Sequence, residues 1–549
     1  MDSPGGGDLA PEAEEVKRGA VAPGSRGDRD HTNMRKLKNL LSGRWVEGTG
    51  VEAVLVNPST DEARAEASTK GLSRAEALAF ARDTGGPTLR AMTFTERAAL
   101  LESWSKAIHE AREELILIGM KNAGNTRGDA KFDLDGATGT LMAYAEMGKT
   151  LGAAKERWDG EAVDMGRSSR MQGRHAFLPR HGVAVLINAF NFPAWGFAEK
   201  AACAVLAGMP VLVKPATITA ELAHRIFEIL TAKNLVPPGV MSFLCGGAGD
   251  LLDHLEFQDC VAFTGSAHTG AMIRSHPRIL ERGVRVNVEA DSLNTAILGA
   301  DVDTDSETFD LFIRDVFNDL TQKAGQKCTA IRRVVAPAAR REAILERLNV
   351  ELSRLVVGNP ESDNVRMGPL AGPAPFKDAR AALEKLLACT KVALGDPKKT
   401  GGLDVPAGKG SFLHPLFLEA ASAESAPAVH AVEVFGPVST FVPYDGSAGH
   451  AAKITALGGG GLVASFYSDD RDFAAELVRG MGTCQGRLVW GSKRTAGTAP
   501  TPGTVFPNFI HGGPGRAGGG EELGGLRGLD FYSQRVAIQG FGPLLEKLF

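Results

Sequence analysis

The 549-residue sequence lacks any uninterrupted apolar run of about 18 residues, the length that indicates a helix crossing a bilayer. It also lacks an excess of one charge, since 61 Lys and Arg and 65 Asp and Glu leave a net charge of −4. No basic balance points to nucleic acid, and no basic amphipathic segment points to a membrane surface. We therefore expect neither nucleic acid nor a membrane as a partner.

Cysteine is scarce, and the 6 cysteines show neither C-x-x-C spacing nor a regular framework. This argues against a disulfide scaffold and a cysteine-based zinc site, and favours a reducing compartment. The 12 histidines show no H-E-x-x-H or similar metal-binding spacing. We predict a cytoplasmic protein without a resident metal.

The chain is longer than one small hydrophobic core supports, so two or three domains are expected. Residues 1–33 are rich in glycine, proline and charge, and they lack the apolar core of a signal peptide. We predict that this segment is a disordered extension.

From residue 182 onward, short apolar runs alternate with helical segments. The predicted strands are residues 183–187, 211–213, 241–244, 261–263 and 284–288, and the predicted helices between them include 194–206 and 219–230. Such alternation predicts an α/β fold, in which a parallel sheet is covered by helices and binds ligands at the carboxyl ends of its strands. A second α/β region follows, with helices at 310–320 and 341–355 and a strand at 333–335.

The segment Lys-Ala-Gly-Gln-Lys-Cys-Thr-Ala at 323–330 carries the strongest chemical signal. It places Cys328 after a small flexible run, with Lys323 and Lys327 nearby. Positive charge favours the thiolate, which is the nucleophile of cysteine chemistry. Taken alone, a single cysteine is more often a small buried side chain.

Two further residues fit the roles that such a nucleophile needs. Glu289 ends an apolar strand, where burial would raise its pKa and suit it to act as a general base. The amide of Asn191 could stabilise an oxyanion together with the backbone N–H of Cys328. The alternatives are a surface glutamate that ends a strand and a turn asparagine before Pro193.

A nucleotide cofactor is indicated at the ends of the same strands. Gly265 and Ser266 follow a strand and open a helix, where backbone N–H groups bind pyrophosphate, although many such turns contain Gly-Ser. Lys214 could bind an adenosine ribose or a 2′-phosphate, or be a solvated lysine. Thr217 offers a hydroxyl where a carboxylate would repel a 2′-phosphate, so we favour NADP over NAD.

The segment Glu-Val-Phe-Gly-Pro at 433–437 offers a carboxylate for the nicotinamide ribose, Glu433, and an aromatic ring to pack near it, Phe435. The alternative is an ordinary loop before a strand.

Several short motifs follow one another along the chain, and together they are more informative than each alone. They are Asn-Phe-Pro at 191–193, Lys-Pro-Ala-Thr at 214–217, Phe-Thr-Gly-Ser at 263–266, the Glu289 segment, Gly-Gln-Lys-Cys at 325–328 and Glu-Val-Phe-Gly-Pro at 433–437. From about residue 37 to residue 539 the chain resembles the aldehyde dehydrogenase family. The resemblance implies that Cys328, Glu289 and Asn191 are catalytic, and that Lys214, Thr217, Gly265, Ser266, Glu433 and Phe435 contact the cofactor.

The resemblance also implies a reaction and a domain plan. Cys328 would attack an aldehyde, hydride would leave for NADP or NAD, and Glu289 would activate the water that hydrolyses the thioester. Residues 34–157 and 181–290 would form a Rossmann-type dinucleotide-binding domain, and 291–506 a catalytic domain. Residues 158–180 and 507–549 would form bridging β elements of a homodimer or homotetramer, with a strand at 535–539.

Three segments narrow the resemblance: residues 288–294, 325–333 and the glycine-rich 511–525. They are similar to the branch that contains 3,4-dehydroadipyl-CoA semialdehyde dehydrogenase and the phenylacetate-pathway ring-opening aldehyde dehydrogenase. This implies a coenzyme A-linked semialdehyde from aerobic benzoate or phenylacetate breakdown as substrate. Segment 491–507 departs from that branch and is predicted to line the substrate entrance. The alternatives are a CoA-acylating enzyme of the same fold and a catalytically silent nucleotide-binding protein.

Overall fold

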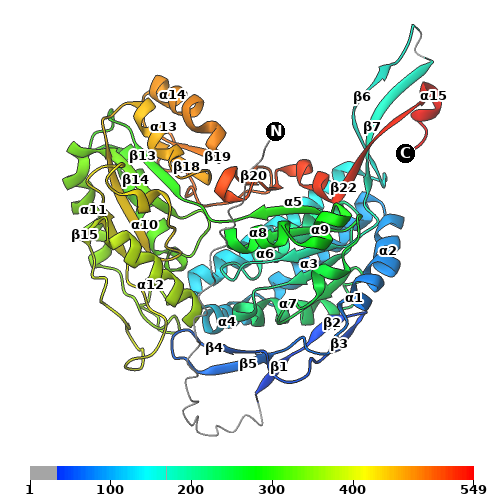
Figure 1. The fold of residues 1–549 in the computed structure, drawn as a ribbon, viewed down its shortest axis with the longest axis horizontal. Helices are drawn as coiled ribbons and strands as arrows, with labels where there is room; N and C mark the ends of the chain where they lie inside the picture. Colours follow the sequence, from blue (N-terminus) through cyan, green and yellow to red (C-terminus); the bar gives the residue numbers. More distant parts are fainter. Residues whose placement is uncertain (1–33, 168–169) are drawn as a thin grey trace, which may run out of the picture. The chain divides into compact units, whose positions relative to one another are not determined.

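Two seven-stranded sheets form the framework of residues 34–167 and 170–549, which the computed structural model describes (Figure 1). The predicted extension at 1–33 lies outside the described residues. Among the residues described, no helix is both long enough and apolar enough to cross a membrane.

The first sheet has the strand order β12-β11-β8-β9-β10-β2-β3. Its strands are β2 (Asn39–Leu41), β3 (Arg44–Val46), β8 (Ala184–Ile187), β9 (Val211–Lys214), β10 (Met241–Phe243), β11 (Cys260–Thr264) and β12 (Arg285–Glu289). The strands from β8 to β12 are parallel, whereas β2 pairs antiparallel with β10 and with β3.

Helices cover both faces of this sheet because alternate side chains of a strand point to opposite sides. In β8, Ala184 and Leu186 pack into one apolar cluster and Val185 into another. The first cluster includes α2 (Gly86–Ala91), α3 (Phe94–Glu110), α4 (Arg112–Ala123), α5 (Arg127–Leu151), α6 (Trp195–Leu206) and α7 (Ala220–Ala232). The second includes α1 (Arg74–Phe80), α8 (Ala267–Arg274) and α9 (Pro277–Arg282). Burial on both faces explains the unbroken apolar runs in the sequence.

The second sheet has the order β15-β16-β17-β14-β13-β18-β19, with only β15 antiparallel. Its strands are β13 (Asn294–Leu298), β14 (Ile331–Pro337), β15 (Lys391–Leu394), β16 (Leu416–Glu419), β17 (Val438–Tyr444), β18 (Gly461–Tyr467) and β19 (Gln485–Gly491). It packs against α10 (Glu307–Thr321), α11 (Arg341–Ser353), α12 (Pro373–Leu387), α13 (Ala448–Ala456) and α14 (Arg471–Met481).

Smaller sheets complete the fold. The hairpin of β6 (Arg157–Asp164) and β7 (Met171–Pro179) pairs with β22 (Ser533–Phe541), and Figure 1 shows these strands running out beside α15 (Gly542–Leu545). The remaining strands are β1 (Arg35–Leu37), β4 (Ala53–Val56), β5 (Ala63–Ala67), β20 (Ile510–Gly512) and β21 (Glu521–Leu523).

The observed elements confirm the predicted α/β class and the β arm near 158–180, with two local differences. Helix α10 begins before residue 310 because the hydroxyl of Ser306 accepts a hydrogen bond from the N–H of Phe309 and caps it. In the glycine-rich segment, where no strand is predicted from the sequence, β20 and β21 pair with each other.

Candidate active site

The candidate site forms at one edge of the first sheet. Asn191 follows β8, Lys214 ends β9, Gly265 follows β11 and Glu289 ends β12. Because these strands are parallel, their carboxyl ends lie together. The second sheet contributes the loop before β14, which carries Cys328.

Unusual backbone geometry fixes this loop. Lys323, Ala324 and Gly325 have φ angles of 53°, 52° and 68°. These angles lie in the left-handed region, which residues other than glycine avoid. A Cβ atom on Gly325 would lie 2.3 Å from the carbonyl oxygen of Gly436, so only glycine allows this approach. Beyond the turn, the amide of Asn294 donates to the carbonyl of Cys328 at 2.8 Å and orients it.

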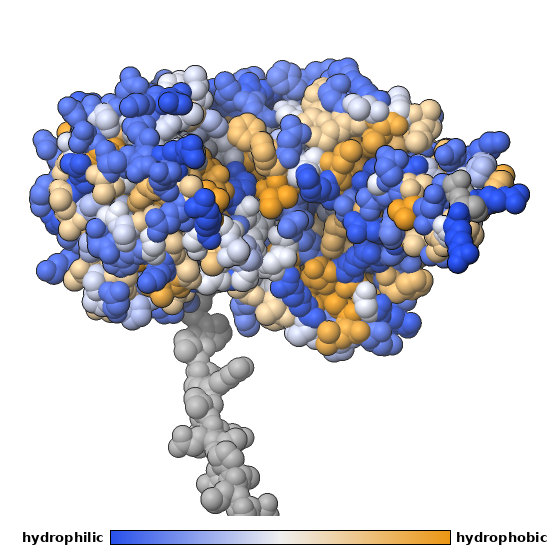
Figure 2. Space-filling view, turned by 90° about the horizontal axis from the view of Figure 1, so that it is seen from above, coloured by the Kyte–Doolittle hydropathy of each residue, from blue (hydrophilic) through white to orange (hydrophobic). Residues whose placement is uncertain are grey.

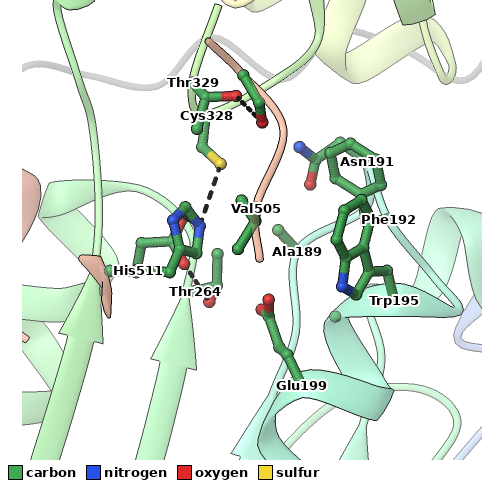
Figure 3. Close-up of a pocket in the computed structure, with 13 residues that line it drawn as sticks. Ala189, Asn191, Phe192, Trp195, Glu199, Thr264, Cys328, Thr329, Val505 and His511 are labelled. Atoms are coloured by element: carbon green, nitrogen blue, oxygen red, sulfur yellow. Dashed lines mark hydrogen bonds and ion pairs between the residues drawn. The ribbon is translucent and has the colours of Figure 1, made fainter. Parts of the chain in front are cut away.

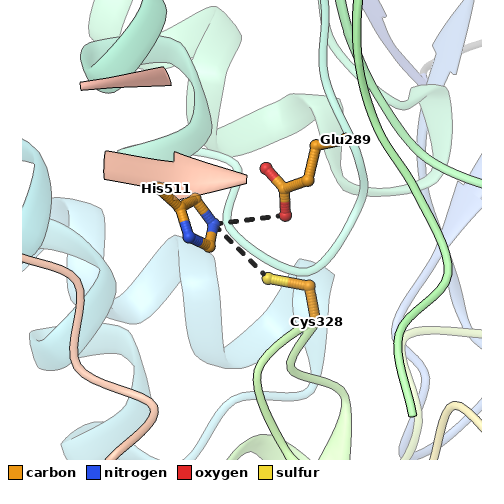
Figure 4. Close-up of side chains that lie close together, drawn as sticks. All are labelled: Glu289, Cys328 and His511. Atoms are coloured by element: carbon orange, nitrogen blue, oxygen red, sulfur yellow. Dashed lines mark hydrogen bonds and ion pairs between the residues drawn. The ribbon is translucent and has the colours of Figure 1, made fainter. Parts of the chain in front are cut away.

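Cys328 and Glu289 are brought together by the fold, and a third side chain joins them (Figure 4). Nε2 of His511, in β20, lies 3.8 Å from Sγ of Cys328 and 3.2 Å from Oε1 of Glu289. Both Glu289 and His511 are buried. His511 belongs to the glycine-rich segment and is not among the residues predicted for the site.

Asn191 also reaches this place. Its amide nitrogen donates to the carbonyl oxygen of Gln326 at 3.0 Å, which ties the end of β8 to the Cys328 loop. Figure 3 shows Asn191 and Cys328 facing a pocket, with Glu199 and His511 below them. Gly503 and Val505 of segment 491–507 line the pocket as well.

The lysines near Cys328 do not have the electrostatic role predicted for them. Lys327 donates to Asp319 at 2.6 Å, and Lys323 donates to Asn125 at 3.1 Å. Burial, and next the charge of Glu289, raise the pKa of Cys328 well above its usual value. The expectation of a thiolate stabilised by Lys323 and Lys327 is therefore wrong, because both ammonium groups are engaged by other partners.

The predicted rise in the pKa of Glu289 is also wrong. Burial does favour the neutral acid, but the charges of His511 and then Lys200 outweigh burial and lower the pKa of Glu289. Conversely, burial lowers the pKa of His511, but Glu289 outweighs burial and raises it. The two groups therefore form a buried pair that holds its charges.

Behind this pair lies a second set of buried charges. Nζ of Lys200 is 2.9 Å from a carboxylate oxygen of Glu199 and 2.9 Å from one of Glu522. Burial raises the pKa of Glu522. The positive charge of Lys200 acts in the opposite direction but is the smaller effect, so the pKa stays raised. Carboxylate oxygens of Glu199, Glu289 and Glu522 lie within 4.8 Å of one another. The site floor is thus strongly polar, which no local sequence motif indicated.

A larger cleft of about 1710 Å³ reaches Cys328 from the side of the first sheet. Its lining includes Lys214, Gly265, Ser266, Glu433 and Phe435, all predicted as cofactor contacts. The cleft also shares Asn191, Glu289 and Cys328 with the pocket. A ligand in the cleft and one in the pocket would meet at the sulfur.

The helix that begins after Ser266 already has partners for two of its first N–H groups. The hydroxyl of Ser266 accepts from the N–H of Thr269 at 3.2 Å, and Asp291 accepts from the N–H of Ala267 at 2.9 Å. Glu433 is also paired, because Arg332 binds its carboxylate at 3.1 Å. Arg332 is a further residue that the sequence did not single out.

Thr217 does not line the cleft. Its hydroxyl donates to the carbonyl of Gly246 at 3.2 Å. Next to this turn lies the carboxylate of Glu52, which accepts from the hydroxyl of Thr69 at 3.0 Å and the N–H of Gly247 at 3.4 Å. Burial lowers the pKa of Lys214, and the nearby Glu52 charge acts against that lowering. A carboxylate from another segment therefore lies near the position that Thr217 leaves uncharged.

Comparisons with known proteins identify what this chain is similar to. The family model described as "Aldehyde dehydrogenase family" matches residues 45–538. The 3,4-dehydroadipyl-CoA semialdehyde dehydrogenase of Aromatoleum evansii is 44% identical over 87% of this chain and 93% of its own length. A betaine aldehyde dehydrogenase of Staphylococcus aureus in complex with NAD+ has 22% identity and a TM-score of 0.80, over 92% of this chain and 95% of that one. An NAD-dependent aldehyde dehydrogenase of Sinorhizobium meliloti has 21% identity and a TM-score of 0.80, over 95% and 98%.

Proposed function

From the premise that this chain belongs to the aldehyde dehydrogenase family and is an oxidoreductase acting on aldehydes, we propose that it oxidises a coenzyme A-linked semialdehyde to the carboxylate with NADP. The observation that carries the proposal is the convergence of Cys328, Glu289 and Asn191 where the cleft meets the pocket. A nucleophile, a base and an amide donor are the groups that acyl chemistry on a cysteine requires.

The reaction begins when Sγ of Cys328 attacks the aldehyde carbon and the carbonyl oxygen becomes an oxyanion. The amide of Asn191 and the N–H of Cys328 stabilise that oxygen. The thiol proton passes to Glu289, whose carboxylate is charged before attack because His511 and Lys200 favour that form. His511 is a positioning residue that holds this carboxylate against the sulfur.

The nicotinamide cofactor supplies the hydride acceptor when it is bound. The cleft fits such a group, because it combines a lysine, a Gly-Ser turn and a buried carboxylate, and it ends at Cys328. After hydride loss, Glu289 first releases the thiol proton to solvent and then takes a proton from water, and the hydroxide displaces the acyl group from Cys328. Glu289 returns this second proton to the departing sulfur. The products are a carboxylate and the free thiol.

NADP preference is the finer part of the cofactor proposal. Lys214 provides a cation for a 2′-phosphate, and Thr217 provides no competing charge. Glu52 acts in the opposite direction, since its carboxylate would favour the free hydroxyls of NAD. We infer NADP because Lys214 lines the cleft itself, whereas the Glu52 carboxylate is engaged by Thr69 and Gly247.

The substrate class is supported by the 44% identical relative and by an open groove beside the pocket. The groove has about 1320 Å³ of space and is lined by Thr501 and Thr504 of segment 491–507, together with Arg354 and Arg366. Guanidinium groups bind phosphates in a bidentate manner, so this groove suits the phosphates of a coenzyme A thioester. The name of the relative specifies a coenzyme A-linked semialdehyde. From the resemblance of segments 288–294, 325–333 and 511–525 we infer a place in aromatic-acid breakdown, such as that of benzoate or phenylacetate.

We assign the first sheet with its helices (34–157 and 181–290) to cofactor binding and the second (291–506) to catalysis, with 158–180 and 507–549 as bridging elements.

A homodimer or homotetramer is supported by β22, which pairs only with β7 within the described chain and leaves an edge open. Exposed apolar residues on this arm are Val163, Met165, Met171, Phe541 and Leu544. Figure 2 shows hydrophobic patches interrupting a mostly hydrophilic face.

All six cysteines are free of disulfide bonds, which supports a cytoplasmic setting.

The test is an assay of reduced cofactor with NADP and with NAD over a panel of aldehydes that includes CoA-linked semialdehydes, run beside Cys328→Ala. We expect turnover with NADP that is lost in the variant, and a carboxylate as product. Product captured as a new thioester when free coenzyme A is added would favour the acylating alternative. Absence of turnover in a folded protein whose Cys328 reacts with alkylating reagents would favour the silent one.

A further inference from the structure

The side chains of Cys328, His511 and Glu289 offer a sulfur, a nitrogen and an oxygen to one point in space (Figure 4). Their ligand atoms all lie within 4.8 Å of one another. The individual separations are 3.8 Å between Sγ and Nε2 and 3.2 Å between Nε2 and Oε1. Thiolate, imidazole and carboxylate are the three ligand types that proteins use for zinc.

The spacing matches what a tetrahedral zinc ion imposes. Zinc binds sulfur at about 2.3 Å, nitrogen at about 2.0–2.1 Å and oxygen at about 2.0–2.2 Å, so two of its ligands are about 3.3–3.6 Å apart. Two of the three observed separations, 3.8 Å between sulfur and nitrogen and 3.2 Å between nitrogen and oxygen, differ from that range by only a few tenths of an ångström. The third, between sulfur and oxygen, is within 4.8 Å.

We propose that Cys328, His511 and Glu289 form a zinc-binding site, and that Zn²⁺ bound there reversibly inhibits the enzyme by engaging its nucleophile. The three ligands come from separate elements: Glu289 ends β12, Cys328 precedes β14, and His511 lies in β20. Because the fold holds them in place already, zinc binding loses little conformational entropy.

A second observation concerns the carboxylate. Oε1 of Glu289 is buried and faces Nε2 of His511 at 3.2 Å, in an ion pair whose hydrogen-bond geometry is poor. A zinc ion between the two atoms would bind both of them directly in place of this ion pair. This oxygen is the one that points toward the proposed ion.

The surrounding charges favour a cation. Glu199 and Glu522 lie with Glu289 in one carboxylate cluster, and Lys200 is the cation that pairs with the first two. Arg487 is a further positive group, close enough to interact electrostatically with Cys328 and Glu289. Both cations are attached to fixed elements, whereas the position between sulfur and imidazole is reached from the pocket.

Binding exchanges protons for the metal. The S–H bond of Cys328 breaks, the sulfur pair forms the S–Zn bond, and the proton leaves to solvent. An imidazolium at His511 likewise releases its Nε2 proton before that nitrogen coordinates. The fourth position of the tetrahedron faces the pocket and takes a water molecule. The coordinated sulfur has no free pair directed at an aldehyde, so attack stops until zinc dissociates.

The inhibition part rests on the proposed function, whereas binding does not, and the test separates them. Full-length protein free of metal is titrated with Co²⁺, whose absorption reports thiolate coordination and tetrahedral geometry, and then with Zn²⁺ to displace it. The same samples are alkylated with iodoacetamide to measure protection of Cys328. Dehydrogenase activity is followed in parallel, with and without a chelator.

We expect one Co²⁺ per chain with a thiolate-to-cobalt band, displaced by Zn²⁺, and slow alkylation of Cys328 under zinc. His511→Gln should weaken zinc binding at least about 100-fold, since even the loss of an outer partner of a metal ligand costs 10–100-fold. Glu289→Gln provides a second variant, and thermal unfolding verifies that both fold. Cys484→Ser is the matched control and should behave like the unaltered chain.

The proposal is overturned if Co²⁺ gives no thiolate band, or if His511→Gln and Glu289→Gln both bind zinc as tightly as the unaltered protein. An active enzyme whose turnover zinc leaves unchanged would also overturn it. If zinc protects Cys328 in a protein that oxidises no aldehyde, the zinc site stands and the proposed function fails. Inhibition that a chelator reverses supports both.

Discussion

The protonation states of Cys328 and Glu289 are coupled, because a charge on Glu289 disfavours a charge on Cys328. In the proposed mechanism the carboxylate must be charged to accept the thiol proton and later a water proton, yet that same charge raises the pKa of Cys328. His511 and Lys200 resolve the conflict on the side of Glu289, because their positive charges keep its pKa low despite burial. At the residue scale, therefore, the site favours a ready base and a neutral thiol over a preformed thiolate.

Replacing Glu289 by glutamine tests this division of labour. Glutamine cannot take the thiol proton, but removing the negative charge lowers the pKa of the thiol, so that solvent can take this proton instead. Attack and hydride transfer should therefore persist, whereas water is no longer activated. We expect kcat to fall about 10²–10⁴-fold, which is the usual contribution of a general base. Rapid mixing should still give a burst of about one reduced cofactor per active chain. Loss of the burst together with kcat would show that Glu289 is already required for the attack.

The ion pair of His511 and Glu289 predicts a dependence of stability on pH. Glu289 raises the pKa of His511 above its unfolded value of about 6.5, so the pair stabilises the folded chain fully below that pH. The contribution is lost as the pH rises through the folded pKa of His511. The difference in Tm between the unaltered chain and His511→Gln should shrink from slightly acidic to alkaline pH. Exposed His268→Gln is the control, and a difference that grows with pH would contradict the assignment.

We predict that cofactor preference depends on two residues with opposite effects, Thr217 and Glu52. Thr217→Glu adds a carboxylate that repels a 2′-phosphate, so kcat/KM should shift toward NAD. Glu52→Gln removes a carboxylate near Lys214 and should shift kcat/KM further toward NADP. Comparing kcat/KM for the two cofactors in each variant cancels general losses of activity. An equal ratio of kcat/KM for NADP to kcat/KM for NAD in the unaltered chain and both variants would show that neither residue distinguishes the two cofactors.

At the scale of elements, the loop that carries Cys328 depends on Gly325. Gly325→Ala places a Cβ 2.3 Å from the carbonyl oxygen of Gly436 and strains a φ of +68°. Gly401→Ala is the matched control, since it has a φ of +72° and no neighbour within 4 Å. Both should lose about 1 kcal/mol of stability from backbone strain. Only Gly325→Ala should also displace Cys328 and reduce kcat, together with the alkylation rate of Cys328.

Elements and site residues differed in how far the sequence predicted them. Strands such as β8 and β9 were predictable because residues buried on both faces of a parallel sheet form continuous apolar runs. Asn191, Lys214 and Glu289 were predictable as candidates because they end such strands. His511 was not, since it lies 183 residues from Cys328 and no local pattern marks the approach. The roles assigned to Lys323 and Lys327 were wrong because sequence proximity does not show which carboxylate or amide each ammonium binds.

At the scale of the whole molecule, both layers contribute to each candidate ligand site. The cleft is lined by the strand ends of the first sheet and by α12 of the second layer, whereas the groove with Arg354 and Arg366 is lined by residues of α5, α10 and α11. The cleft shares Cys328 with the pocket, and Thr504 of the groove is adjacent in sequence to the pocket residues Gly503 and Val505. A substrate whose large polar part stays in the groove while its aldehyde enters the pocket is consistent with this plan, and a coenzyme A thioester has that form.

This arrangement predicts that substrate size and groove charge are coupled. Reversing both charges, Arg354→Glu with Arg366→Glu, should raise KM for a CoA-linked semialdehyde about 10-fold or more, which corresponds to about 1.4 kcal/mol of binding free energy. KM for a short free aldehyde should not change, because such a molecule fits the pocket without touching either arginine. Higher salt should weaken the CoA-linked substrate in the unaltered enzyme and have less effect in the variant. Equal rises in KM for both aldehydes would mean that the substitutions distort the pocket, and the groove would then have no part in recognising coenzyme A.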